Sequence, residues 1–392
     1  MPGYASAGDQ LYAIITSHWL HALAWTLQSM CAKPTCVLLS SLTPSTGNAI
    51  TAARLCSHLT SLGWQARLVD AYQRDPAVTS LELEPASPAA VPDLLIAINA
   101  VRCWPAVQTY PATIPFVLVL GGTDVNCAGE SAEKQAAVSR ALQRACHVVA
   151  FSGSLCDALD AFRLPGTGAP PVTCIPQAVG TPDLSDGAGD ARQLLRAAAG
   201  VPQACPILLL PAGLRPVKDV LWLLPALQAH ASAHLVIVGP VLHEQYADAV
   251  RAAQAACPRV HVLGPVPRVQ LWAWYSQATA VLNTSQSEGQ CGAVMEALAR
   301  GALVIARRNA GNAAICEPAC TCWSAGCSAS CAGIDWLVDT PEQAMQVLDW
   351  AAEHASHAQA VCERAETHAQ AHWSLDAELN AWHDVLGHVT PG

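Results

Sequence analysis

The 392-residue sequence predicts an α/β protein with two domains, each built on a parallel sheet that helices cover on both faces. Short apolar runs alternate with segments of helical length along most of the chain, which is the pattern of βαβ units. The runs are continuously apolar, as expected for strands in a sheet that is buried on both faces. The chain is also longer than the roughly 250 to 300 residues at which a single hydrophobic core stops growing.

Composition narrows the class of protein. With 52% hydrophobic and 13% charged residues, the chain is not a disordered tail, a collagen-like fibre or a small disulfide-stapled module. A formal net charge of -10 argues against a nucleic-acid partner, because phosphate backbones are bound by a surplus of Lys and Arg. The 17 cysteines are spread through core-like segments, which favours a reducing compartment and a cytoplasmic location.

Residues 1–34 are predicted to form a helical extension. No charged residue lies between Asp9 and Lys33, a stretch long enough to raise the question of a membrane segment. Apolar residues recur at helical spacing, but His18, His21 and Gln28 interrupt them. We expect an amphipathic helix over residues 11–32 that lies on the body, on a protein partner or weakly on a membrane. The alternative is a signal or signal anchor, which would place the protein in the secretory pathway or outside the cell.

The first domain is predicted over residues 35–180. A helix over about residues 49–62 follows its first strand. Five buried strands are expected at residues 36–41, 66–71, 94–100, 116–122 and 147–152.

Two segments rich in Pro, Gly and Asp, residues 164–171 and 181–190, then interrupt the pattern, and we assign residues 181–200 as the linker. The second domain is predicted over residues 201–370. Its strands are expected at residues 206–213, 234–240, 260–264, 280–285 and 302–308. Residues 371–392 form a last helix, with Leu375, Leu379, Trp382 and Leu386 on one face.

Ligands of such sheets lie outside the carboxyl ends of the strands, so the loops at those ends are the first candidates for a site. The loop after residues 206–213 contains Gly213, Arg215 and Lys218, and Lys218 is one of only three lysines in the chain. A forked Arg and a compact Lys suit a diphosphate. The alternative, a solvated basic helix start, is less favoured because the helix dipole is already positive there.

A second cluster follows residues 280–285. Glu288 lies in the strand-to-helix turn, Gly289 permits a close backbone approach, and Glu296 lies about two turns into the helix. Amides at the helix start can hold a phosphate, and the two carboxylates can accept hydrogen bonds from sugar hydroxyls. A solvated helix face would also explain two glutamates at this spacing.

Several motifs occur in a fixed order along residues 35–390: LRPVKD, HLVIVGP, VLGPVP, NTSQSEG, the two spaced glutamates and RRNAGNAA. In this order the sequence resembles the retaining family-4 glycosyltransferases of the GT-B fold. The resemblance implies two Rossmann-like domains that face each other across a cleft. It also implies that the last helix crosses back to the N-terminal domain.

The resemblance assigns roles to the second domain. Arg215 and Lys218 match the pair that binds the donor diphosphate, and Lys218 would stabilise the leaving group. Glu288 matches the glutamate that contacts the donor sugar near the reacting carbon, and Glu296 matches the one that binds the ribose. Donor contacts through the main chain are implied for Gly289, Gln290, Cys291 and Val266, the last one next to the base.

In the first domain, Gly47 and Asn48 match a glycine loop that approaches the diphosphate from the opposite wall, although a plain turn would also explain them. Asp124, in the motif GGTD, follows the fourth strand and is expected to point into the cleft. There it would position the acceptor or transfer a proton. The alternative is a buried or capping aspartate.

Two features depart from the family pattern. Gln290, Cys291 and Gly292 replace a glycine-rich helix start that carries an aromatic residue, so the sugar pocket is expected to differ in shape. A cysteine-rich run occupies the place of a compact loop, and residues 333–338 are expected to restore a strand after it. The run lacks paired C-x2-C spacing, which favours free thiols over a zinc site. Its cysteines are Cys316, Cys320, Cys322, Cys327 and Cys331.

The resemblance implies a metal-independent, retaining transfer of a sugar from a UDP- or GDP-sugar to an unidentified acceptor, without a cofactor. The sequence has no D-x-D carboxylate pair for a metal ion. Two alternatives stay open: a catalytically silent protein that binds a nucleotide sugar or a partner on the same fold, and a nucleotide-sugar epimerase.

Overall fold

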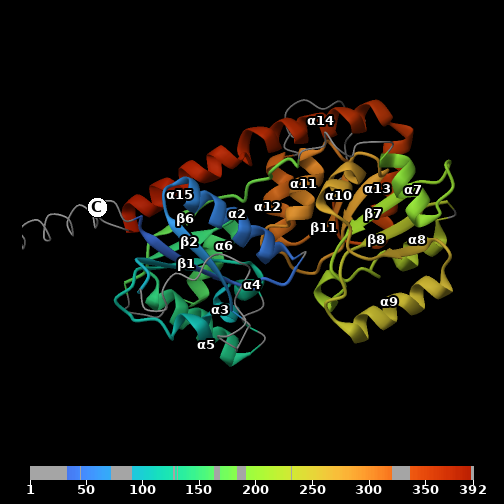
Figure 1. Ribbon diagram of the computed structural model, residues 1–392. Coiled ribbons are helices and arrows are strands. Elements are labelled where there is room, and N and C mark those ends of the chain that lie inside the picture. Colours follow the sequence, from blue (N-terminus) through green and yellow to red (C-terminus); the bar gives the residue numbers. More distant parts are fainter. Residues whose placement is uncertain are drawn as a thin grey trace, which may run out of the picture.

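The computed structural model describes residues 33–44, 46–71, 91–126, 129, 131–162, 168–182, 191–230, 232–319 and 336–389 (Figure 1). The helix expected over residues 11–32 lies outside these residues. So do four of the five cysteines in the cysteine-rich run, the exception being Cys316, which is buried within the helix over residues 310–319.

The first sheet has six parallel strands in the order β2-β1-β3-β4-β5-β6. The strand order reverses beside β1, which pairs with β2 on one side and β3 on the other. Its strands are β1 (Thr35–Ser40), β2 (Gln65–Asp70), β3 (Leu94–Ile98), β4 (Phe116–Val119), β5 (His147–Ala150) and β6 (Val172–Cys174). Helices of this domain are α2 (Gly47–Ser61), α3 (Ala100–Val107), α4 (Thr123–Asn126), α5 (Ala132–Arg144) and α6 (Gly153–Ala158), followed by η2 (Leu159–Phe162).

The second sheet has six parallel strands in the order β12-β11-β10-β7-β8-β9, and its order reverses beside β7. The strands are β7 (Ile207–Pro211), β8 (His234–Val238), β9 (Val260–Leu263), β10 (Ala280–Asn283), β11 (Val304–Arg307) and β12 (Leu337–Val338). Its helical segments are α7 (Ala191–Ala199), η3 (Pro216–Lys218), α8 (Leu224–Ala229), α9 (Glu244–Ala256), α10 (Arg268–Tyr275), α11 (Gly292–Ala299), α12 (Ala310–Ala319) and α13 (Pro341–Glu353).

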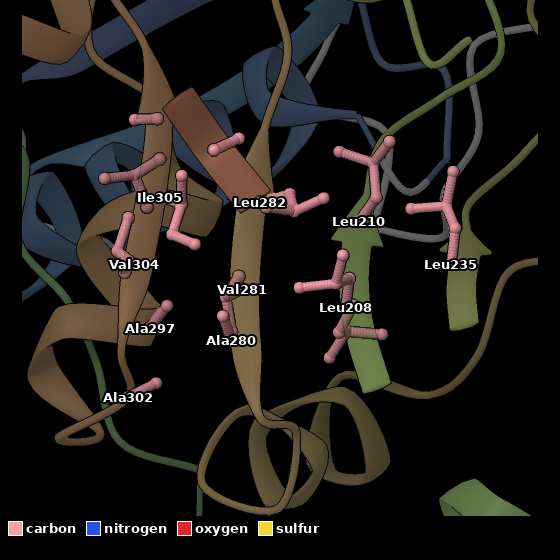
Figure 2. Close-up of a cluster of buried hydrophobic side chains, with 14 of the residues drawn as sticks. Leu208, Leu210, Leu235, Ala280, Val281, Leu282, Ala297, Ala302, Val304 and Ile305 are labelled. Carbon is pink, nitrogen blue, oxygen red and sulfur yellow. The ribbon is translucent and has the colours of Figure 1, made fainter. Parts of the chain in front are cut away.

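The core of the second domain fixes the strands whose ends carry the candidate site. Figure 2 shows apolar side chains of β7, β10 and β11 side by side, among them Leu208, Val281 and Ile305. Each of these three side chains is at most 1% exposed. Because such a core is packed like an organic crystal, the carboxyl ends of β7 and β10 are held at a fixed separation.

The two C-terminal helices, α14 (Ala355–His372) and α15 (Leu375–Val389), pass from the second domain back to the first (Figure 1). Trp382, Val385 and Leu386 of α15 belong to the hydrophobic core of the first domain. Glu378 of α15 also accepts hydrogen bonds from Arg54 and His58 of α2, at 2.7 and 2.8 Å. The last helix is therefore part of the N-terminal domain in packing, although it follows the C-terminal domain in sequence.

Within the described parts of the chain, none of the helices combines the length and the apolar character that crossing a membrane would need.

Candidate active site

A buried ion pair joins the carboxyl ends of two neighbouring strands. Lys218 ends η3, in the connection that follows β7, and Glu288 lies in the turn between β10 and α11. The Nζ atom of Lys218 is 2.5 Å from Oε1 of Glu288, and the side chains are 16% and 10% exposed. Burial alone would raise the pKa of Glu288, but the Lys218 charge and hydrogen bond outweigh it and leave that pKa below its ordinary value. Burial likewise opposes the charge on Lys218, whereas Glu288 raises the pKa of this lysine.

Two buried asparagines hold Glu288 in place. Asn283, the last residue of β10, donates through Nδ2 to Glu288 Oε1 at 3.2 Å and to Cys291 Sγ at 3.0 Å. Its Oδ1 accepts a hydrogen bond from Nδ2 of Asn312 at 3.0 Å. Both amides are therefore oriented by their partners, and the carboxylate is pre-positioned rather than free to rotate. Sequence reasoning missed both residues, although an Asn at the end of a buried apolar run is a detectable signal.

Glu296 lies in α11 and is held separately. Its Oε1 accepts a hydrogen bond from Nε of Arg268 at 2.9 Å, and its Oε2 accepts one from the hydroxyl of buried Tyr275 at 3.1 Å. Burial and the nearby carboxylate raise the pKa of Tyr275 well above its ordinary value. Arg268 is 41% exposed and also donates to the carbonyl of Gly180, at 2.7 Å. Glu296 is thus held by buried Tyr275 on one side and by the exposed Arg268 on the other.

The other predicted donor contacts surround the ends of these strands. Gly213 follows β7, and a Cβ atom added there would lie 2.6 Å from Cδ1 of the exposed Leu242 side chain, so the two loops pass close to each other. Arg215 is half-buried and precedes η3, and Val266 follows β9 and packs on the domain core. In the first domain, Gly47 begins α2, and the carbonyl of Asn48 accepts a hydrogen bond from Ser40 at 3.4 Å. Cys291 is 6% exposed and burial raises the pKa of its thiol to about 11.

Asp124 does not lie open in the cleft as expected. It is 2% exposed, and its carboxylate accepts hydrogen bonds from the backbone amides of Ala100, Gly121 and Val125 at 2.8, 3.3 and 3.2 Å. Burial raises its pKa, and the surrounding amides only partly offset this effect. The geometry favours the capping alternative, because the side chain fixes the backbone of the GGTD loop and the start of α3.

The turn that carries Glu288 contacts the first domain. Asn126 of α4 donates through Nδ2 to the carbonyl of Glu288 at 2.9 Å. Gln177 donates through its backbone N and its Nε2 to Gln290, at 2.8 and 3.1 Å. Gln290 therefore contacts the first domain through both its side chain and its backbone carbonyl. These contacts join residues more than a hundred positions apart and leave no local sequence signal.

Among the described residues, no three or more His, Cys, Asp and Glu side chains are grouped closely enough to hold a metal ion.

Two six-stranded parallel sheets, a C-terminal helix that returns to the first domain and a site between the domains define the GT-B fold. Solved structures agree with this assignment. Sucrose-phosphate synthase from Thermosynechococcus elongatus superposes with a TM-score of 0.68 at 16% identity, covering 91% of this chain and 99% of that chain. Anabaena Alr3699/HepE in complex with UDP and glucose gives a TM-score of 0.66 at 15% identity, with 91% and 100% covered.

Residues 205–338 match the family model for glycosyl transferases group 1, so the second domain is similar to the domains of that family. The chain is also a homologue of "Glycosyltransferase 1 domain-containing protein 1" from Xenopus tropicalis. The two are 28% identical over 293 residues, which cover 71% of this chain and 80% of the relative. The predicted GT-B fold is confirmed, and the resemblance to glycosyltransferases agrees with the group 1 match.

Proposed function

We propose that the protein transfers a sugar from a nucleoside-diphosphate sugar to an acceptor, with the donor bound in the cleft between the two domains. The observation that carries this proposal is the buried Lys218–Glu288 pair at the strand-order reversal of a group 1 domain. In open parallel sheets ligands bind at this position. Similar structures support it: Anabaena Alr3699/HepE has been solved in complex with UDP and glucose and also with UDP-glucose.

Lys218 and Arg215 supply the positive charge that a departing diphosphate requires. The ammonium group of Lys218 has three donors, so it can keep its hydrogen bond to Glu288 while it donates to a phosphate oxygen. Because the site is largely excluded from water, this charge acts more strongly there than it would on an open surface. Backbone amides of Gly289, Gln290 and Cys291, at the start of α11, add fixed dipoles on the same side.

Glu296 binds the ribose in this proposal. The hydroxyls of a ribose can donate to its carboxylate once the exposed Arg268 has turned away, while Tyr275 keeps the carboxylate in place from the buried side. Main chain beside Val266 contacts the base, which leaves both a UDP-sugar and a GDP-sugar open as donors. Gly47 and Asn48 close over the diphosphate from the first domain.

We further propose that the transfer retains the anomeric configuration and needs no metal ion or cofactor. The acceptor attacks on the face from which the diphosphate leaves, and a donor phosphate oxygen takes the acceptor proton. The Asp124 carboxylate is hydrogen-bonded to backbone amides and so is not placed to act as a general base. A route in which the donor phosphate takes the proton does not need such a base.

A nucleotide panel tests the proposal. UDP, GDP, UDP-sugars and GDP-sugars are added to the purified protein, with ATP as a control, and the melting temperature is measured. A ligand present at about 100 times its dissociation constant stabilises the folded state by about 2.7 kcal/mol, so a true donor raises the melting temperature clearly. Absence of stabilisation by every uridine and guanosine compound contradicts the proposal.

Product analysis then separates the possible activities. The stabilising nucleotide sugar is incubated with the protein, and the products are identified by mass spectrometry and NMR. Slow release of nucleoside diphosphate and free sugar supports a transferase that uses water in place of its acceptor. An epimerised nucleotide sugar identifies an epimerase, and tight binding without any product over a broad acceptor panel identifies a catalytically silent binding protein.

A further inference from the structure

The turn that carries Glu288, residues 287–290, is called the glutamate loop here. It is enclosed by the backbones of both domains. On the C-terminal side, a Cβ atom added to Gly311 would lie 2.3 Å from the carbonyl oxygen of Glu288, so α12 packs directly beneath the loop. On the N-terminal side, a Cβ atom added to Gly122 would lie 2.2 Å from Cα of Gly289. Gly122 also has a φ of 86°, which disfavours any other residue there.

Asn126 reaches the glutamate loop from a rigid base. Its amide donates to the carbonyl of Glu288 at 2.9 Å, and its own backbone N donates to the carbonyl of Gly122 at 2.8 Å. The one-turn helix α4 that carries it is anchored by the buried carboxylate of Asp124. The donor of Asn126 is therefore held in position before the two domains meet, which lowers the entropic cost of the contact.

Gln177 reaches the same loop from the segment that follows β6. Its backbone N and its Nε2 both donate hydrogen bonds to Gln290. Its side-chain oxygen Oε1 accepts hydrogen bonds from Thr51 at 2.6 Å and from Arg54 at 3.2 Å. Thr51 and Arg54 lie on α2, the helix that begins at Gly47. Gln177 is 9% exposed, so its amide is fixed by partners on both sides rather than by solvent.

We infer that Asn126 and Gln177 are positioning residues that hold the glutamate loop when the cleft is closed, so that Glu288 is set in its reactive place by the first domain. The inference rests on the proposed function and adds to it a role for the N-terminal domain. Glu288 keeps its contacts to Lys218 and Asn283 within its own domain, whereas the backbone of its loop is held by both domains. The first domain therefore fixes the backbone that carries the carboxylate, while Lys218 and Asn283 orient the carboxylate itself.

Matched variants isolate these two contacts. Asn126→Ala removes the bond to the carbonyl of Glu288. Gln177→Ala removes the Nε2 bond to Gln290 together with the bonds to α2, and leaves the bond from the Gln177 backbone N. Gln177→Glu also lacks the Nε2 donor but keeps an acceptor for Thr51 and Arg54. Gln108→Ala, at an exposed position after α3, is the control. Amide hydrogen exchange is measured on the full chain without ligand, and turnover of UDP-glucose is measured in parallel.

Each Asn126 and Gln177 variant is expected to speed exchange about fivefold in peptides spanning 121–126 and 287–291, as loss of a hydrogen bond worth about 1 kcal/mol implies. Exchange in β1 and β7 is expected to stay at the wild-type rate. In turnover, kcat is expected to fall about fivefold with KM changed less than twofold, because an orienting contact acts on the bound complex.

Wild-type exchange in both loops would overturn the inference, and so would acceleration throughout the cores, since this would show a role in folding alone. A wild-type protein that turns over no nucleotide sugar of the panel contradicts the proposed function instead. In that case the exchange rates still decide whether Asn126 and Gln177 hold the loop.

Discussion

Three carboxylates are buried among the described residues, and each is surrounded by donors: Asp124 by backbone amides, Glu288 by Lys218 and Asn283, and Glu378 by Arg54 and His58. A buried charge without partners would cost several kcal/mol, so the partners determine what each carboxylate can do. Only Glu288 is paired with a lysine, which can also serve a ligand. Asp124 and Glu378 are committed to holding the structure.

Replacing Asp124 by Ala tests the capping role. Three backbone amides lose their acceptor, and we expect the free energy of unfolding to fall by about 1 to 3 kcal/mol. Urea denaturation of the variant measures this change, with Asp157→Ala at an exposed position as the control. A variant with wild-type stability and strongly reduced turnover would restore the acceptor or proton-transfer role instead.

Glu378 predicts a pH dependence of stability. Burial raises its pKa, but the hydrogen bond from His58 and the charge of Arg54 outweigh burial and leave the pKa below the ordinary 4.5. A lowered folded-state pKa contributes stability above about pH 4.5, and this contribution is lost as the pH falls through the folded-state value. Glu378→Gln should therefore differ most from wild type near neutral pH, by up to about 3 kcal/mol, and least in acid.

Thermal unfolding between about pH 3 and pH 7 measures this difference for Glu378→Gln, with exposed Glu353→Gln as the control. A difference in stability that stays the same across this range would contradict the assigned pairing.

At the scale of elements, continuous apolar runs were sufficient to predict most strands. The runs over residues 94–100 and 280–285 extend past β3 and β10, because Asn99 already caps α3 and the residues after Asn283 form the turn that leads to α11. β6 was missed, since it has three residues and none of its side chains is buried. An edge strand of this kind carries no apolar signal.

Part of the candidate site was predictable from the order of the strands. Lys218 and Glu288 could be placed together, because parallel strands bring their carboxyl ends to one edge of the sheet. The contacts of Asn126 and Gln177 to the glutamate loop could not be predicted, because they depend on how the two domains pack. The buried position of Asp124 could not be predicted either, because a residue at the end of a strand can point into the cleft or cap neighbouring backbone amides.

The return helix α15 leads to a prediction about packing. Trp382 is 2% exposed and lies in the core of the first domain, so Trp382→Ala should lower the free energy of unfolding by about 3 to 5 kcal/mol. Leu375→Ala, at a position that is 43% exposed on the same helix, should change it by less than about 1 kcal/mol. Chemical denaturation of both variants measures the contrast, and equal losses would contradict the assignment of α15 to the first core.

At the scale of the whole molecule, the low content of charge is explained by two sheets that are buried on both faces. The net charge of -10 does not oppose an anionic donor, because binding depends on the local cations Arg215 and Lys218. Of the three lysines, Lys33 is exposed before β1 and Lys134 lies in the first turn of α5. Of the three, Lys218 alone belongs to the candidate site, where it contacts Glu288.

The central claim is that Lys218 stabilises a departing nucleoside diphosphate. The most direct test compares the rate of diphosphate release from the donor in Lys218→Ala and in Lys33→Ala, which removes a lysine from the surface. We predict that Lys218→Ala lowers turnover by about a hundredfold or more, as expected for a lost transition-state contact, and that Lys33→Ala has the wild-type rate. Wild-type turnover in Lys218→Ala would contradict the account.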